Sequence, residues 1–183
     1  GWFEEMIPNY SEFYEGRYFN PGWEKIIGRF LGRLSGANGN EAFIFLWTMW
    51  KNLVVGAEIC EDVWVLNPPS IAHASAGATV IVNCSASDEV TGKSEYRRSL
   101  ISGQSARLLC AYIYANAGEG ESSQDLVFGG QNIIAENGNI LSESARFENQ
   151  TIYADIDLER LECERRRMTT YQTEGREDYR FVS

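Results

Sequence analysis

Short apolar runs, separated by polar, glycine-rich or proline-containing connections, recur along the chain from residue 53 onward. Three of these runs, the first of them partly β-branched, predict buried strands, at residues 53–59, 78–84 and 110–115. The stretches between them predict helices at residues 70–76, after a proline pair, and 94–109, where apolar positions recur at helical spacing. This strand–helix–strand–helix–strand order predicts an α/β fold in which a mostly parallel sheet is covered by helices.

After the third predicted strand the pattern changes to shorter segments. Strands are predicted at residues 126–128, 132–135 and 139–141. Asn137-Gly138, between the last two, predicts a tight hairpin turn, so this region is expected to be antiparallel. Residues 151–156 predict a further strand, and Asp157 is placed to cap a helix that continues to Arg167.

Residues 22–52 do not follow this order. They contain three of the five tryptophans, a patch rich in glycine, asparagine and serine at residues 35–40, and an apolar run at residues 42–50. The apolar run has neither strict alternation nor a helical stripe, and no cap or hairpin spacing before it fits a pair of strands. We therefore assign this segment no structure and expect it to be the least well packed part of the chain.

The length of 183 residues bounds the chain to one domain or a piece of one. Its formal net charge of −10, from 26 acidic and 16 basic residues, argues against a duplex nucleic-acid binder, because phosphate contacts require clustered lysine and arginine. The arginines are expected in solvent. Arg97 falls on the outer side of the helix at 94–109, and Arg165, Arg166 and Arg167 follow glutamates on a charged helix face.

The four cysteines include no CxxC pair and the chain has one histidine, His73, which argues against a zinc site. Cys84 and Cys110 lie inside predicted buried strands, where a free thiol behaves as a small hydrophobic group, and no disulfide is expected. The sequence shows no signal-peptide pattern and no uncharged apolar stretch of about 18 residues. These features favour a reducing, cytoplasmic location.

Cys60 carries candidate chemistry through its position. It ends the predicted strand at 53–59 and is followed at once by Glu61 and Asp62, in the segment VVGAEICEDVW. A strand that ends in a cysteine at a sharp turn exposes a nucleophile above the edge of a sheet. A buried structural cysteine fits these residues equally well. The two neighbouring carboxylates disfavour the thiolate, so a working nucleophile needs a base or a cation from elsewhere.

Successive sequence blocks resemble one known family. Residues 53–171 contain GAEICEDVW, NPPS, GATVIVNCSAS, GKSEYRR, SARLLCAYIYANAGEGESSQDLVFGGQ, IAENGNILSESARF and DIDLERLECERRRMTT, and residues 7–22 read IPNYSEFYEGRYFNPG. These blocks are similar to the nitrilase-type glutaminase domain of glutamine-dependent NAD synthetases, in the carbon-nitrogen hydrolase superfamily. The resemblance implies an α-β-β-α sandwich, incomplete at the N-terminus in this chain, in which two such domains pack sheet against sheet into a four-layer dimer.

The family hydrolyses the side-chain amide of glutamine with a Cys, Lys, Glu triad, in which the glutamate is the general base and the lysine stands near the developing oxyanion. The resemblance places the nucleophile at Cys60 and an additional supporting acid at Glu15. By position, it implies substrate contacts for Tyr10, Glu61, Trp64, Ser87 and Lys93. A place in the core is equally consistent for Tyr10 and Trp64, and an exposed loop charge is equally consistent for Lys93.

The chain departs from the family pattern at two triad positions. Glu4 stands at the position where the family has the triad lysine. The strand–helix region that would carry the triad glutamate is not found in the sequence. The synthetase half, which would bind ATP and deamido-NAD, is not found either, so no cofactor is expected in this domain. The expected partners are glutamine, a synthetase domain and further copies of the chain. We therefore expect little or no glutaminase activity from this chain alone.

Two other functions stay open on the sequence. One is a free-standing amidase that acts on another small amide, and the other is a non-catalytic remnant that keeps the fold. The resemblance stops sharply at residue 22 and resumes at residue 53. These sharp edges favour an altered reading frame in the source gene over a divergent insertion.

Overall fold

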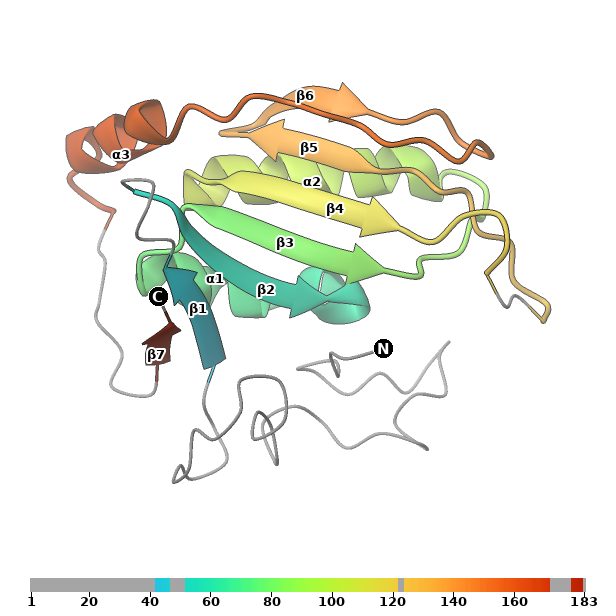
Figure 1. Cartoon of the computed structure of the whole chain (residues 1–183), viewed down its shortest axis with the longest axis horizontal. Coiled ribbons are helices and arrows are strands. Elements are labelled where there is room, and N and C mark those ends of the chain that lie inside the picture. Colours follow the sequence, from blue (N-terminus) through green and yellow to red (C-terminus); the bar gives the residue numbers. More distant parts are fainter. Residues whose placement is uncertain (1–41, 47–51, 122–123, 172–178, 183) are drawn as a thin grey trace.

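The computed structural model describes residues 42–46, 52–121, 124–171 and 179–182. Its strands form one seven-stranded sheet in the order β6-β5-β4-β3-β2-β1-β7 (Figure 1). The strands are β1 (Ala42–Leu46), β2 (Val54–Ile59), β3 (Val80–Ser85), β4 (Ala111–Asn116), β5 (Ile133–Glu136), β6 (Asn139–Glu143) and β7 (Tyr179–Val182). Strands β2, β3 and β4 are parallel to one another, β5 and β6 follow them as an antiparallel pair, and β1 runs antiparallel to β2 and parallel to β7.

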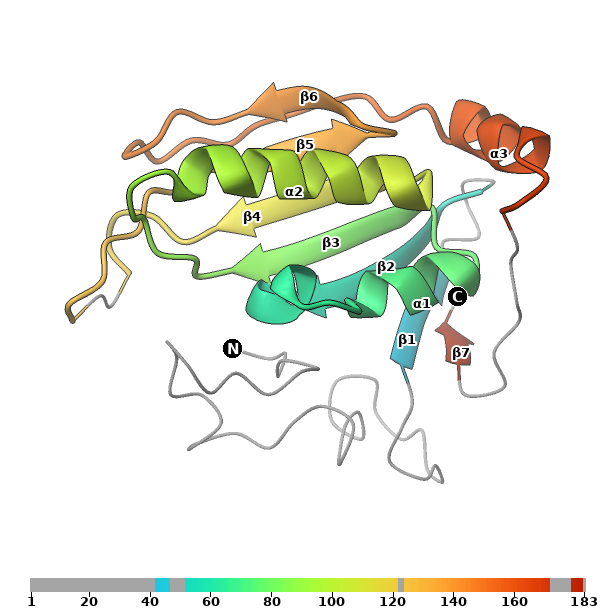
Figure 2. The same cartoon turned by 180° about the vertical axis from the view of Figure 1, so that it is seen from behind.

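Helices cover one face of this sheet. The helical elements are η2, a 3-10 helix (Cys60–Trp64), and the α-helices α1 (Pro69–Ser75), α2 (Lys93–Leu108) and α3 (Leu158–Arg167). Helices α1 and α2 lie on the same face of the sheet, and α3 lies near the amino ends of β3 and β4 (Figures 1 and 2). The described residues therefore form an α/β unit of one sheet and one helical layer. No helix in this part of the chain has the length and apolar character needed to span a membrane.

The core has two parts, one on each face of the sheet. The larger cluster lies between the sheet and helices α1 and α2 and includes Ile81, Ile101 and Tyr112, all fully buried. The smaller cluster joins Leu161 of α3 to the opposite face of β3 and β4. Glycine is required at position 56, because a Cβ atom there would stand 2.9 Å from the Cβ of a helix α1 residue, so α1 packs directly on β2.

Most of the elements expected from the sequence are confirmed. The three parallel strands, the two helices between them and the antiparallel pair β5–β6 all form. The hairpin turn has positive φ at both Asn137 (43°) and Gly138 (87°), the combination that the two-residue turn requires. Asp157 caps α3 as expected, since its side chain accepts a hydrogen bond from the backbone N–H of Arg160 at 2.9 Å.

Two predicted strands are wrong. Residues 126–128 contribute an isolated bridge, Asp88 to Phe128, and no strand. Residues 151–156 alternate between exposed and half-buried positions but pair with no neighbouring strand. Ile156 packs against the smaller core cluster.

The apolar run at residues 42–50 also behaves differently from the prediction. Its first part forms β1, which pairs with β2 in a register that places Ile44 opposite Gly56. A strand pair therefore exists where no hairpin spacing predicted one. Residues 22–41 and 47–51 lie outside the described residues, so the expected poor packing of the segment stays a prediction.

Three expectations about burial are wrong. Cys84 is exposed, because it lies next to Ile59 and Ala115 on the face of the sheet that α1 and α2 do not cover, whereas Cys110 is buried as expected. Arg97 is fully buried, although its helix position predicted solvent contact. Arg165 is also buried, whereas its neighbours Arg166 and Arg167 form the exposed, glutamate-paired helix face that was predicted.

Candidate active site at the carboxyl ends of the parallel strands

Cys60 stands directly after β2, at the point where the chain leaves the sheet. Its φ angle is +50°, in the left-handed region that side-chain-bearing residues rarely adopt, and the residue is only 8% exposed. The turn is fastened from within, because the buried carboxylate of Asp62 accepts a hydrogen bond from the N–H of Ile59 at 2.9 Å. Strained backbone of this kind is concentrated at functional sites, where the surrounding structure holds it in place.

A second fastening comes from the neighbouring strand. Asn83 of β3 is buried, and its Oδ1 atom accepts a hydrogen bond from the N–H of Cys60 at 3.0 Å. Its Nδ2 atom donates to the carbonyl of Cys60 at 3.3 Å. The Ser85 hydroxyl donates to Oδ1 at 2.7 Å. One side chain thus bridges both peptide groups of the candidate nucleophile.

Asn83 also belongs to a series of buried hydrogen bonds that extends to residues of α1 and α2. Its Nδ2 atom donates to the Tyr112 hydroxyl at 3.2 Å, and this hydroxyl donates to Glu58 Oε1. Glu58 Oε2 accepts from the N–H of Ser70 at 2.7 Å, and Gln104 donates to the Ser70 hydroxyl at 2.8 Å. Burial raises the pKa of the Glu58 carboxyl, and the hydrogen bonds from Tyr112 and Ser70 offset only part of this effect. Burial, with the charge of Glu58, raises the pKa of Tyr112 well above 10.0.

Ser87 follows β3 at the same edge of the sheet and is held on two sides. Its N–H donates to Asn116 Oδ1 at 2.8 Å, and its carbonyl accepts from Asn116 Nδ2 at 3.1 Å. Its hydroxyl accepts a hydrogen bond from Arg97 at 3.1 Å. The Asn116 amide therefore bridges the two peptide groups of Ser87 in the same way that Asn83 bridges those of Cys60.

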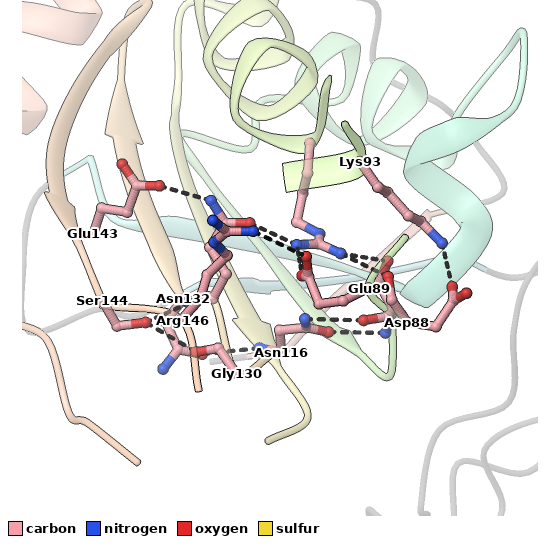
Figure 3. Close-up of polar contacts among 12 residues, drawn as sticks. Asp88, Glu89, Lys93, Asn116, Gly130, Asn132, Glu143, Ser144 and Arg146 are labelled. Carbon is pink, nitrogen blue, oxygen red and sulfur yellow. Dashed lines mark hydrogen bonds and ion pairs between the residues drawn. The ribbon is translucent and has the colours of Figure 1, made fainter. Parts of the chain in front are cut away.

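Arg97 is fully buried and contacts a group of charged and amide side chains. Figure 3 shows the surroundings of this group, including Glu89 and Glu143, and Lys93 paired with Asp88. The Arg97 Nη1 atom donates to Glu89 Oε1 and to Gln131 Oε1, both at 2.5 Å, and its Nη2 atom also donates to the carbonyl of Asp88 at 3.0 Å. The Gln131 Nε2 atom donates in turn to Glu143 Oε1 of β6 at 2.7 Å. This ladder ties the amino end of α2 to the loops that flank β4 and β5.

Trp64 and Lys93 lie close together near the amino end of α2. The Lys93 ammonium is paired with Asp88 and stands 5.6 Å from the centroid of the Trp64 ring. The Trp64 ring also packs against the largely exposed Tyr96, with ring centroids 5.3 Å apart. Lys93 is thus a paired and mostly buried charge, and Glu61 is half-buried beside Cys60.

Tyr114 of β4 connects the surroundings of Cys60 with those of Ser87. The residue is 1% exposed, and its hydroxyl makes no hydrogen bond of acceptable geometry within the described part of the chain. Burial is the main cause that raises the pKa of this hydroxyl, and Cys60 raises it further. The nearby hydroxyls of Ser85 and Ser87 and the charge of Arg97 lower it by less. The Tyr114 hydroxyl thus lies within reach of the hydroxyls of Ser85 and Ser87.

The structure brings together four of the candidate residues from the sequence at one edge of the sheet: Cys60, Trp64, Ser87 and Lys93. Glu61 stands next to Cys60, whereas Tyr10 and Glu15 lie outside the described residues. Sequence reasoning missed the buried polar residues that hold the site. Their signal was present, since Glu58 and Asn83 are polar residues in the interior of apolar strands, where each needs a partner. No group of three or more His, Cys, Asp or Glu residues in the described ranges could hold a metal ion.

Comparisons with known proteins agree with this architecture. The family model for carbon-nitrogen hydrolases matches residues 2–166. A glutamine-dependent NAD(+) synthetase of Mycobacterium leprae is 44% identical over 176 residues, which cover 94% of this chain and 26% of that protein. A second, from Thermotoga maritima, is 30% identical over 155 residues, which cover 84% of this chain and 23% of that protein. The chain thus spans about a quarter of the length of the curated relatives it matches.

Solved structures show the same fold. The crystal structure of a carbon-nitrogen hydrolase from Helicobacter pylori G27 matches 92% of this chain and 55% of its own, with a TM-score of 0.65 at 22% identity. That of a glutamine-dependent NAD(+) synthetase from Cytophaga hutchinsonii matches 78% of this chain and 22% of its own, with a TM-score of 0.59 at 29% identity. The fold is therefore of the nitrilase-superfamily type, and the chain belongs to the carbon-nitrogen hydrolase family.

Proposed function

We propose that this chain supplies part of the glutaminase half of a glutamine-dependent NAD synthetase and that Cys60 is the nucleophile. The observation that carries the proposal is the left-handed turn of Cys60 at the end of a central parallel strand, held by Asp62 and Asn83. Ligands bind at the carboxyl ends of parallel strands in open α/β sheets, and a cysteine fixed there in a strained turn is placed to attack a bound substrate. The 44% identity to a glutamine-dependent NAD(+) synthetase supports glutamine as the source of the amide.

In the proposed reaction the Cys60 sulfur attacks the side-chain amide carbon of glutamine and gives a tetrahedral intermediate. The intermediate collapses with cleavage of the carbon–nitrogen bond, the thiol proton leaves with the nitrogen as ammonia, and a thioester remains on Cys60. Water then adds to the thioester carbon, glutamate leaves and a proton returns to the sulfur. Donors and positive charge near the tetrahedral oxygen lower the barrier of both steps.

The remaining contacts follow the family positions. Glu61 and Ser87 would hold the α-amino and α-carboxylate groups of glutamine, and Trp64 would form a wall of the pocket. Lys93 would add a basic contact, although its pairing with Asp88 neutralises much of its charge. Tyr10 would line the pocket and Glu15 would support the triad. ATP and deamido-NAD would bind to a synthetase domain, the partner that consumes the ammonia, and further copies of the chain would form a homo-oligomer.

We also propose that the 183-residue chain alone hydrolyses glutamine slowly or not at all. Glu4 stands in the register of the triad lysine, and the triad glutamate has no counterpart in this sequence. The carboxylates of Glu61 and Asp62, next to Cys60 in the sequence, disfavour the thiolate form of a nucleophile. Ammonia release should therefore fall below the roughly 1 per second that is typical of enzymes.

The test uses a diazoketone analogue of glutamine, which alkylates a nucleophile that lies against the bound side chain. The adduct should form on Cys60, excess glutamine should slow it, and Cys60→Ala should abolish it, whereas Cys84→Ala, which removes an exposed thiol, should retain it. If the analogue modified Cys84 and Cys163 as fast as Cys60 and glutamine gave no protection, the proposed function would be rejected. Ammonia release at 1 per second or faster, lost in Cys60→Ala, would keep the function and refute the proposed impairment.

A further inference from the structure

We propose that Asn83 is a positioning residue for Cys60, a clamp that holds the nucleophile turn in its left-handed conformation. The nucleophilic role of Cys60 belongs to the proposed function, and the inference rests on it in that respect. The conformation of the turn is a property of this structure and is tested separately. Asn83 touches no reacting atom, so its effect is exerted through the backbone of Cys60.

The Asn83 side chain uses its whole hydrogen-bonding capacity at this position. Its oxygen accepts from the N–H of Cys60 and from the Ser85 hydroxyl, and its nitrogen donates to the carbonyl of Cys60 and to the Tyr112 hydroxyl. The N–H of Cys60 can only donate and its carbonyl can only accept, so the orientation of the Asn83 amide is fixed. A flipped amide would oppose donor to donor and acceptor to acceptor at Cys60.

The clamp takes over where the sheet ends. The ladder between β2 and β3 stops at the pair Ile59 and Cys84, so the peptide groups of Cys60 have no partner strand. Because φ at Cys60 is +50°, its N–H and carbonyl turn out of the ladder, and a side chain from β3 has to satisfy them. The Asn83 nitrogen also donates to the Tyr112 hydroxyl, which in turn donates to Glu58, so the Asn83 side chain is itself held in place.

The opposite end of β2 provides a matched control. There the Thr79 hydroxyl, just before β3, accepts from the N–H of Val54 at 3.1 Å and donates to the carbonyl of Asn52 at 2.6 Å. This side chain is buried and bridges two backbone groups of the same segment, as Asn83 does. It lies at the amino end of β2, away from Cys60, so Thr79→Val removes a clamp of the same kind without touching the candidate site.

The experiment compares Asn83→Ala, Asn83→Asp and Thr79→Val with the parent chain. The first measurement is hydrogen exchange of the Cys60 amide, which donates to the Asn83 oxygen. Asn83→Ala should accelerate this exchange at least tenfold, relative to the amides of β3. Thr79→Val should leave the Cys60 amide unchanged and accelerate exchange at Val54.

The pH dependence of the conservative variant separates positioning from general stability. Asn83→Asp keeps an acceptor for the Cys60 N–H but loses the donor and directs a carboxylate oxygen at the Cys60 carbonyl. In acid the introduced carboxyl becomes protonated and can donate again, and burial moves its pKa upward. Exchange of the Cys60 amide, normalised to the parent chain, should therefore be fast at pH 8 and return toward the parent rate at pH 5. A loss of packing alone would not show this recovery.

The second measurement is alkylation of Cys60 by a small neutral reagent, relative to the exposed Cys163 of the same molecule. Asn83→Ala leaves space beside the turn, so the thiol should move inward and the ratio should fall at least tenfold. If the exchange rate and the ratio both stayed within twofold of the parent, the clamp would be rejected. It would also be rejected if Thr79→Val changed Cys60 as much as Asn83→Ala did, or if Asn83→Asp showed no acid recovery.

These results are distinguishable from those that decide the proposed function. A clamp effect in Asn83→Ala, together with no glutamine-protected labelling of Cys60, would keep the positioning role and reject the glutaminase function. Glutamine-protected labelling of Cys60, together with unchanged exchange in Asn83→Ala, would do the reverse.

Discussion

A buried arginine lies at the amino ends of the parallel strands and another at their carboxyl ends, and the two differ in the groups that accept their hydrogen bonds. At the amino edge, Arg165 of α3 donates only to backbone carbonyls, those of Ala78 at 2.6 Å, Leu109 at 2.9 Å and Leu108 at 3.2 Å. At the carboxyl edge, Arg97 donates mainly to side chains. The amino edge therefore closes strand ends that would otherwise leave carbonyl groups unpaired.

The carboxyl edge has spare hydrogen-bonding capacity that the amino edge lacks within the described residues. The buried side-chain atoms without a hydrogen bond there are Glu89 Oε2, Arg97 Nε and Tyr114 Oη. Glu89 Oε2 has an ion pair with Arg146 at 3.8 Å. An unsatisfied buried polar group costs about 1–3 kcal/mol. The hydrogen bonding of the carboxyl edge is therefore less complete than that of the amino edge within the described residues.

The largest effect is expected at the carboxyl edge. Arg97→Met leaves the buried carboxylate of Glu89 without its main counter-charge, so the free energy of unfolding should fall by about 3–5 kcal/mol. The matched control is Arg98→Met, which removes an exposed arginine paired with Glu143 and should cost within about 0.5 kcal/mol. Urea denaturation measures both. Equal losses in the two variants would show that the Arg97 ladder is no more important than a surface ion pair.

A somewhat smaller effect is expected at the amino edge. Arg165→Met removes the donor to the carbonyls of Ala78 and Leu109, whereas the Leu108 carbonyl keeps its hydrogen bond from the Tyr171 hydroxyl. The free energy of unfolding should therefore fall by roughly 2 kcal/mol, at about 1 kcal/mol for each carbonyl left without a donor. Arg166→Met, at an exposed neighbour paired with Glu162, should stay within about 0.5 kcal/mol. Hydrogen exchange of the Cys60 amide should not change in Arg165→Met. A change there would contradict the separation of the two edges.

The pH dependence of stability should report on Glu58. Its pKa is raised above the ordinary value of 4.5 in the folded protein, so its contribution to stability is fully present below pH 4.5 and is lost as pH rises through the folded pKa. The expected loss is about 1.4 kcal/mol for each unit of the shift. Glu58→Gln should remove this part of the pH dependence, measured as the urea midpoint between pH 4 and pH 8. An unchanged slope would show that Glu58 is not the group responsible.

The smallest effect concerns the cap that starts α3. Asp157→Ala removes the acceptor for the N–H of Arg160, so stability should fall by about 1 kcal/mol, the usual cost of a lost N-cap. Asp155→Ala, two residues earlier at an exposed position, should change stability by less than about 0.5 kcal/mol. Thermal unfolding of both variants gives the comparison. A loss larger than that of Arg165→Met would mean that the cap, and not the arginine, holds the amino edge together.

The sequence alone determined the elements that depend on local chemistry. Short apolar runs predicted β2, β3 and β4, because a strand buried on both faces is a continuous apolar run. The turn at Asn137-Gly138 and the cap at Asp157 were predictable because each needs one residue type at one position. The place of Cys60 at the end of β2 followed from the same local pattern, and its family blocks indicated the chemistry.

Only the tertiary structure decided which polar residues are buried and what they bind. Arg97 and Arg165 have surface-like sequence surroundings, but each has a partner from a distant segment. Arg97 donates to Gln131, 34 residues away, and Arg165 donates to Ala78, 87 residues away. Asn83 reaches Cys60 because the register of β3 on β2 aligns it there. Periodicity fixes which side of an element is apolar. It does not fix the register and closure of the sheet, and these long-range contacts supply the partners that make a buried charge or a strained turn stable.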